Sequence, residues 1–72
     1  MPMRVEITDA NLLTDLVEAL RHGGCRANLA TKESCDVVHP LASTESEALL
    51  EVAFFVRSWQ LRHPSVGATV SP

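Results

Sequence analysis

Apolar and polar residues alternate in four short segments of the chain, and each of these segments predicts a strand. Residues 3–7 carry apolar side chains at every second position, with charged side chains between them. The same period recurs over residues 25–30 and 35–39, and the short polar turn between these two segments predicts a hairpin. Residues 66–70 alternate more weakly because a glycine interrupts them, so we expect a short edge strand there.

A different period separates the first two strands and predicts an amphipathic helix. Leucine, valine and alanine side chains recur every three or four residues from Leu12 to Leu20, and polar residues fill the opposite side. Thr8 or Asp9 is placed to cap the first turn through its side-chain oxygen. The Gly-Gly pair at residues 23–24 should end the helix, because glycine readily takes the positive φ found just past a last turn.

The longest apolar-rich segment, residues 44–64, predicts a second helix with both ends marked. Thr44 and Glu47 form a capping box, so this helix should begin at Glu45, and Pro64 closes it. An apolar arc should face the sheet or the other helix, and it consists of Ala48, Leu49, Val52, Ala53, Phe55, Val56 and Trp59.

Leu50, Phe54 and Leu61 fall outside this arc of the second helix. They share their side of the helix with the charged residues Glu47 and Arg57, so they should not form the deepest core. Two interpretations remain open: Leu50 and Phe54 pack against the neighbouring helix of the same chain, or the three residues form a contact surface for a partner. A 72-residue domain has a small core that association would stabilise, so we expect a homo-oligomer. These three residues, or alternatively the edge strands of the sheet, should supply the contact.

The predicted element order is therefore β-α-β-β-α-β, in one domain that spans residues 1–72. The helix between the first two strands implies a right-handed crossover, and the short turn implies that the second and third strands pair. We expect an α+β fold, a ferredoxin-like sandwich in which two helices cover one face of an antiparallel-rich sheet. The third strand should lie beside the first inside the sheet, with the second strand and the tail at its edges.

Facing residues of the hairpin must share a side of the sheet, and this requirement fixes its register. Ala27 should lie opposite Val37 and Leu29 opposite Cys35, with an odd-numbered loop centred on Lys32. The buried face of the sheet then carries small and apolar side chains from both strands.

Cys25 falls opposite His39 in this register, and the pair is the main candidate for chemistry. A thiol beside an imidazole is typical of a nucleophile pair or of half a zinc site, with His22 as a further candidate ligand. The alternative is that both are ordinary core residues, since buried cysteine acts as a small hydrophobe and the chain has no Cys-x-x-Cys or His-x-x-x-His spacing. Cys35 should lie about 13 Å from Cys25 at about 3.3 Å per residue, too far for a disulfide. We expect free thiols, no metal, no cofactor and no catalytic residue.

Two further groups of side chains have both a chemical and a structural interpretation. Asp9, Asp15 and Glu18 could form a general acid–base site, but their places in the cap and on the polar side of the first helix favour a solvated surface. Trp59 and the two phenylalanines could stack on a ligand, but their helical spacing favours core or interface packing.

The overall charge and hydropathy restrict the partners. The formal net charge is −3, and the six basic residues are scattered along the chain, so we expect no nucleic-acid binding. The chain has no run of about 18 apolar residues and its start lacks the pattern of a signal peptide. We therefore expect a soluble cytoplasmic protein with reduced cysteines and no membrane partner.

From Val5 to Leu20 the chain carries a strand, a Thr-Asp turn and the pattern Leu-Leu-x-x-Leu-Val-x-x-Leu, followed after the Gly-Gly pair by another strand. This stretch resembles the opening half of an ACT-type regulatory domain, although Ala10-Asn11 stands where such domains usually have Pro-Gly or a similar pair. The resemblance implies the ferredoxin-like order and a small-molecule ligand, commonly an amino acid, bound between copies. We therefore expect a non-enzymatic interaction or ligand-sensing module. The alternatives are a thiol- or metal-dependent protein using Cys25 and His39, and a structural subunit.

Overall fold

The computed structural model describes residues 2–72, and its strands and α-helices follow the predicted order. A short 3-10 helix over Ala10–Leu12, which the sequence pattern does not predict, leads into the first α-helix. The strands and α-helices are β1 (Met3–Ile7), α1 (Leu13–His22), β2 (Arg26–Thr31), β3 (Ser34–Val38), α2 (Glu45–Leu61) and β4 (Ala68–Ser71).

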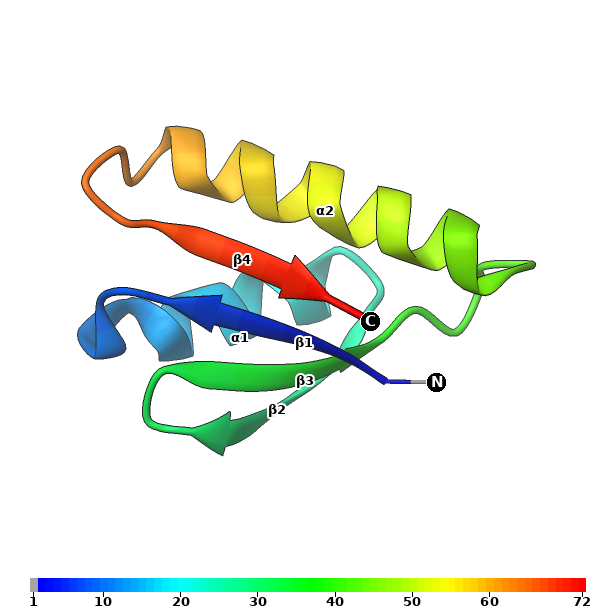
Figure 1. Ribbon diagram of the computed structural model, residues 1–72, viewed down its shortest axis with the longest axis horizontal. Coiled ribbons are helices and arrows are strands. Elements are labelled where there is room, and N and C mark those ends of the chain that lie inside the picture. Colours follow the sequence, from blue (N-terminus) through cyan, green and yellow to red (C-terminus); the bar gives the residue numbers. More distant parts are fainter. Residues whose placement is uncertain (1) are drawn as a thin grey trace.

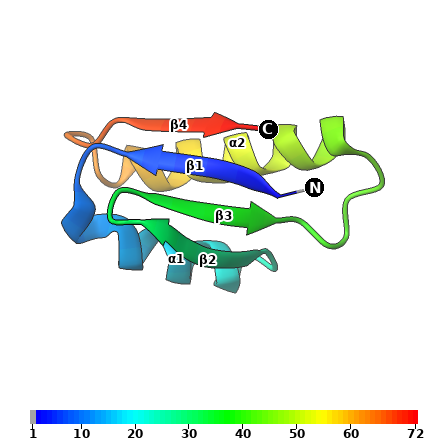
Figure 2. The same ribbon diagram turned by 60° about the horizontal axis from the view of Figure 1, so that its bottom comes forward.

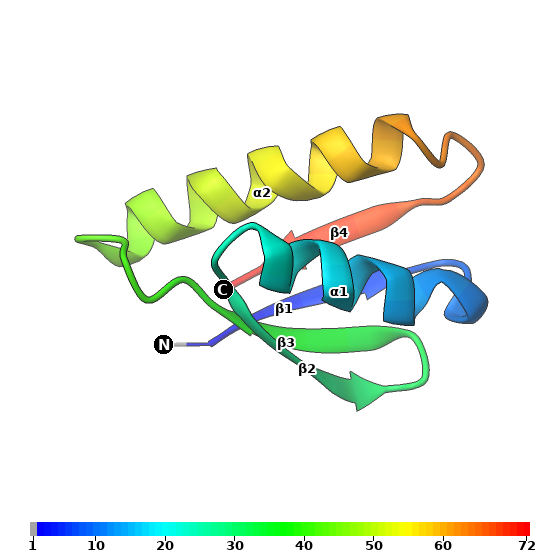
Figure 3. The ribbon, with the colours of Figure 1, turned by 180° about the vertical axis from the view of Figure 1, so that it is seen from behind.

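The four strands form one sheet in the order β2-β3-β1-β4, with every neighbouring pair antiparallel (Figures 1 and 2). As predicted, β3 lies beside β1 inside the sheet, and β2 and β4 are the edges. Both helices lie on one face of the sheet, as the view from behind shows (Figure 3). The protein is therefore a small α+β domain with a four-stranded antiparallel sheet and two helices.

The hairpin of β2 and β3 has the predicted register in the two pairs that define it. Ala27 pairs with Val37, and Leu29 pairs with Cys35. The predicted odd-numbered loop is wrong, because β2 continues to Thr31, which pairs with the first residue of β3 across a two-residue turn. A β-bulge after Leu29 absorbs the extra residue. Ala27, Cys35 and Val37 are buried as predicted, but Leu29 is 62% exposed, so the prediction that it belongs to the buried face is wrong.

The cap predicted for α2 is present, whereas α1 begins after Leu12, which forms no side-chain cap bond, so the prediction that Thr8 or Asp9 caps this helix directly is wrong. The hydroxyl of Thr44 accepts a hydrogen bond from the N–H of Glu47 at 3.1 Å, and α2 begins where predicted. The carboxylate of Asp9 accepts from the N–H of Asn11 at 3.0 Å and so caps the 3-10 helix. Gly24 takes a positive φ of 93° just after α1, as predicted for this Gly-Gly pair.

The last strand begins two residues later than predicted. The side chain of Val66 is buried, and its N–H donates to the carbonyl of His63 at 3.0 Å, so this residue belongs to the turn after α2. Gly67 then pairs with Thr8, accepting from its N–H at 3.0 Å and donating to its hydroxyl at 2.9 Å. The regular ladder of β4 with β1 starts only at Ala68.

The core lies between the sheet and the helices, and Trp59 is its largest fully buried side chain. The indole Nε1 of Trp59 donates to Oδ2 of Asp15 at 2.8 Å, which ties α2 to α1. The ring of His63 lies 4.4 Å from the indole, and its Nε2 is 3.4 Å from the same carboxylate oxygen. The polar pattern of α1 assigns Asp15 only to a solvated surface, so this tie between the helices is a feature that periodicity does not predict.

Candidate functional site

Three large apolar side chains of α2 are left without cover on the outer side of the helix. Leu50 is 72% exposed, Phe54 is 75% exposed and Leu61 is 71% exposed. This exposure excludes the interpretation that Leu50 and Phe54 pack against α1. We call these three residues the α2 stripe.

The α2 stripe is a consequence of helical geometry. At 3.6 residues per turn, its three members point within about 40° of one another. The buried members of the predicted arc, Ala48, Val52, Val56 and Trp59, occupy the opposite side of the helix. Ala53 is exposed, contrary to the prediction, because it stands at the border of that arc.

Charged residues border the α2 stripe and are segregated along the helix. Glu45 and Glu47 lie in the first turn, whereas Arg57 lies towards the other end and Arg62 follows the last turn. Glu47, Arg57 and Arg62 are exposed, and within residues 2–72 none of them takes part in a salt bridge. The outer face of α2 therefore combines an apolar stripe with acidic groups at one end and basic groups at the other.

The candidate pair Cys25 and His39 lies one residue beyond the last paired positions of β2 and β3. The imidazole of His39 is mostly buried, and its Nε2 is paired with the carboxylate of Glu51 on α2. The Nδ1 atom of His39 is buried and has no hydrogen-bond partner within the described chain, Cys25 included. The histidine therefore connects the end of β3 to α2 and makes no hydrogen bond to the thiol within residues 2–72.

Both thiols are free, and both are buried. Burial raises the pKa of Cys25, and the nearby negative charge of Glu51 raises it further. Burial raises the pKa of Cys35 to about 11, with a smaller contribution from Asp36. Because the thiolate is the nucleophile and the metal ligand, these shifts work against both chemistries at neutral pH.

His22, the further candidate metal ligand, lies at the C-terminal end of α1. It borders a shallow groove between the helices, together with Phe55 and Arg62. Within residues 2–72, no three histidine, cysteine, aspartate or glutamate side chains are placed to hold a metal ion. The sequence pattern did not identify Glu51 as the partner of His39. Glu51 lies one helical turn before the half-buried Phe55, and this position is the sequence signal that indicates a contact directed towards the sheet.

A cavity of about 400 Å³ opens at the end of the molecule where α2 begins. Met3, Val38 and Leu49 form apolar parts of its wall, and Thr44 and Ser46 at the start of α2 contribute hydroxyl-bearing side chains. Pro2 and Pro72 also border this cavity, so the first and last described residues lie at the same end of the sheet (Figure 1). Its volume lies within the range of about 300–1,000 Å³ that is typical of small-molecule sites.

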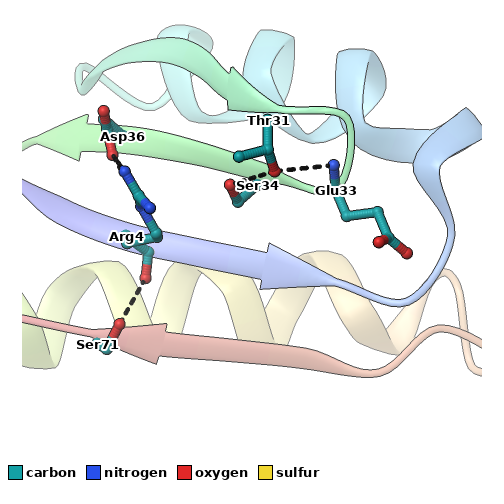
Figure 4. Close-up of polar contacts among 6 residues, drawn as sticks. All are labelled: Arg4, Thr31, Glu33, Ser34, Asp36 and Ser71. Carbon is teal, nitrogen blue, oxygen red and sulfur yellow. Dashed lines mark hydrogen bonds and ion pairs between the residues drawn. The ribbon is translucent and has the colours of Figure 1, made fainter.

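The face of the sheet that the helices leave open carries polar side chains that bond to one another. The guanidinium of Arg4 contacts Oδ1 of Asp36 through Nε and Nη2, each at 3.2 Å, and the hydroxyl of Ser71 donates to the carbonyl of Arg4 at 3.4 Å (Figure 4). The hydroxyls of Thr31 and Ser34 lie 2.7 Å apart (Figure 4). This face presents paired polar groups, in contrast to the unpaired apolar surface of α2.

No family model, no curated protein and no solved structure matches this chain. Within residues 2–72, no helix is long and apolar enough to cross a membrane.

Proposed function

We propose that this chain is a small non-enzymatic interaction module of ferredoxin-like fold that works as a homo-oligomer, with the α2 stripe as its contact surface. The observation that carries the proposal is the exposure of Leu50, Phe54 and Leu61, each above 70%, on one face of one helix. Small soluble domains rarely leave large apolar side chains gathered in this way unless a partner covers them. The strand order and the two helices on one face of the sheet support the ferredoxin-like class.

Several other properties fit a module that binds another protein molecule. The acidic net charge of −3 disfavours nucleic acid as the partner. The two buried free thiols suit the reducing cytoplasm, which we propose as the location. A thiol- or metal-dependent function of Cys25 and His39 is less well supported, because the thiol pKa is raised and the imidazole is paired with Glu51.

Sedimentation velocity over a wide concentration range tests the proposal. The apparent mass of the wild type should rise with increasing concentration, from about 7.8 kDa for the single chain towards twice that value for a dimer. Phe54→Glu should stay monomeric, because dimerisation would desolvate the new charge. Leu29→Glu is the matched control, since Leu29 is 62% exposed at the edge strand β2, and it should dimerise like the wild type. A Phe54→Glu variant that associates as strongly as the wild type would reject the α2 stripe as the contact.

A ligand-sensing role is a second candidate function, and the cavity at the start of α2 favours it. Its apolar wall with hydroxyl groups at one end suits a small metabolite that has both an apolar and a hydrogen-bonding part. The resemblance to ACT-type domains suggests amino acids as the first panel. A ligand from that panel should raise the melting temperature of the wild type but not of Ser46→Trp, in which the new ring fills the cavity. Ser65→Trp, an exposed serine outside the cavity, is the control.

A further inference from the structure

We infer that the partner on the α2 stripe is a second copy whose α2 lies antiparallel to the first, with Glu47 of each copy facing Arg57 of the other. The inference rests on the proposed function, since it specifies how a second copy covers the same surface. Its basis is the charge distribution along α2 and the spacing of the stripe residues.

The direction of the pairing follows from the charges. A parallel pair of helices would place Glu47 beside its own copy and Arg57 beside its own copy, and both contacts would be repulsive. An antiparallel pair brings the acidic first half of each helix to the basic end of the other. The helix dipoles also oppose each other in that arrangement, which is favourable. Because Glu47 and Arg57 have no salt bridge inside the described chain, their charges are available to a partner.

The register follows from the spacing. A two-fold axis makes the contact self-complementary, so that residue i touches residue j and j touches i. When the two helices cross on their outer faces at the level of residue 52, residues equally far before and after that level face each other. Leu50 and Phe54 are each two residues from Val52, and Glu47 and Arg57 are each five residues from it. One register therefore joins two leucine–phenylalanine contacts in the middle with two Glu–Arg contacts outside them.

The same register also places Leu61, the last member of the α2 stripe, against the partner. Leu61 lies just past the start of the partner's α2, near the segment before that helix, where Leu41 is 83% exposed. A register one heptad further along would place Leu50 opposite Leu61 but Phe54 opposite Arg57, and Glu47 would pass the end of the partner helix. Of these two registers, only the one centred at residue 52 places both Glu47 and Arg57 opposite a residue of opposite charge.

Charge reversal tests the arrangement. Glu47→Arg and Arg57→Glu each turn two attractive contacts into two repulsive ones, so each should raise the dimer Kd by about fivefold or more. The double variant restores both contacts with reversed sign and should return the Kd to within about twofold of the wild type. Glu18→Arg, an exposed residue of α1 without a salt bridge in the described chain, controls for the change in net charge. Circular dichroism identifies any variant that does not fold, and Arg57→Gln then replaces Arg57→Glu, with a smaller increase in Kd.

The outcomes separate the inference from the function on which it rests. Single reversals that leave the Kd unchanged, or a double variant no better than either single one, would overturn the antiparallel arrangement. If Phe54→Glu still abolishes the dimer in that case, the α2 stripe remains the contact and only its geometry is wrong. If the wild type stays monomeric at every concentration, the proposed function and this inference both fail.

Discussion

Trp59 is a large side chain that is fully buried and carries a polar N–H, which needs a hydrogen-bond acceptor inside the protein. Trp59 is 1% exposed, and within residues 2–72 its indole N–H donates to the carboxylate of Asp15, 2.8 Å away. Asp15→Ala should leave that N–H buried without a partner and cost about 1–3 kcal/mol of the free energy of unfolding. Asp15→Asn keeps an acceptor oxygen and should cost less. Urea denaturation measures both.

Glu18→Ala is the control for this hydrogen bond, because Glu18 is an exposed residue of the same helix. It should change the free energy of unfolding by about 0.5 kcal/mol or less. A loss in Asp15→Ala no larger than this would mean that water satisfies the indole N–H.

The buried thiol of Cys35 should make the free energy of unfolding depend on pH in the alkaline range. Its pKa is about 11 in the folded protein, against 9.0 for an unperturbed thiol, because burial disfavours the thiolate. Between these values the unfolded chain has lost the proton that the folded chain keeps, so the free energy of unfolding falls as pH rises. The contribution is complete below about pH 9 and is lost as pH approaches 11.

Urea denaturation between pH 8 and about 10.5 measures this effect as a slope, whose sign follows from proton linkage. Cys35→Ala is less stable at every pH because it removes a buried side chain, but its slope should be shallower than that of the wild type. Cys25→Ala is the comparison, since the pKa of Cys25 is raised as well. Equal slopes in the wild type and Cys35→Ala would show that other groups cause the alkaline loss of stability.

At the scale of elements, residues 23 and 24 after α1 each require glycine, but for different physical reasons. Gly24 has a φ of 93°, so Gly24→Ala should cost about 1–2 kcal/mol through backbone strain alone. Gly23 has an ordinary φ of −80°, but a Cβ there would lie 2.2 Å from Cε2 of Phe55. Gly23→Ala should therefore destabilise the protein by pushing α2 or the phenyl ring away from the end of α1.

A double-mutant cycle separates these two causes. In a Phe55→Ala background, Gly23→Ala should become nearly neutral or stabilising, because the ring that it displaces is absent. Gly24→Ala should cost the same in both backgrounds, since its strain does not involve Phe55. A cost of Gly23→Ala that does not depend on Phe55 would contradict the steric explanation.

The sequence predicts local features of this fold well and tertiary contacts poorly. The cap at Thr44, the positive φ at residue 24 and the facing of Ala27 and Val37 depend on short-range rules of backbone geometry. The bulge in the hairpin and the bond of Trp59 to Asp15 depend on how whole elements meet, and periodicity holds no information about that. The same limit applies to the candidate site. The pattern identified the α2 stripe, but only the packed helices establish that α1 does not cover it.

At the scale of the whole molecule, association and stability should be one linked property. A domain of 72 residues buries a small core, and covering the α2 stripe would remove further apolar surface from water. If only the folded chain dimerises, mass action makes the melting temperature rise with protein concentration. In the dimeric range, each tenfold increase supplies about 0.7 kcal/mol per chain, which corresponds to about 3–5 °C for a domain of this size.

Differential scanning calorimetry over two decades of concentration measures this dependence. Phe54→Glu should melt at one temperature throughout, and that temperature should match the dilute wild type, because the side chain is 75% exposed and contributes little to the monomer core. Leu29→Glu should keep the wild-type dependence, since its surface lies on β2 and not on α2. A wild-type melting temperature that does not change with concentration would mean that the folded chain is stable without a second copy. The exposed side chains of α2 would then have to serve a different partner.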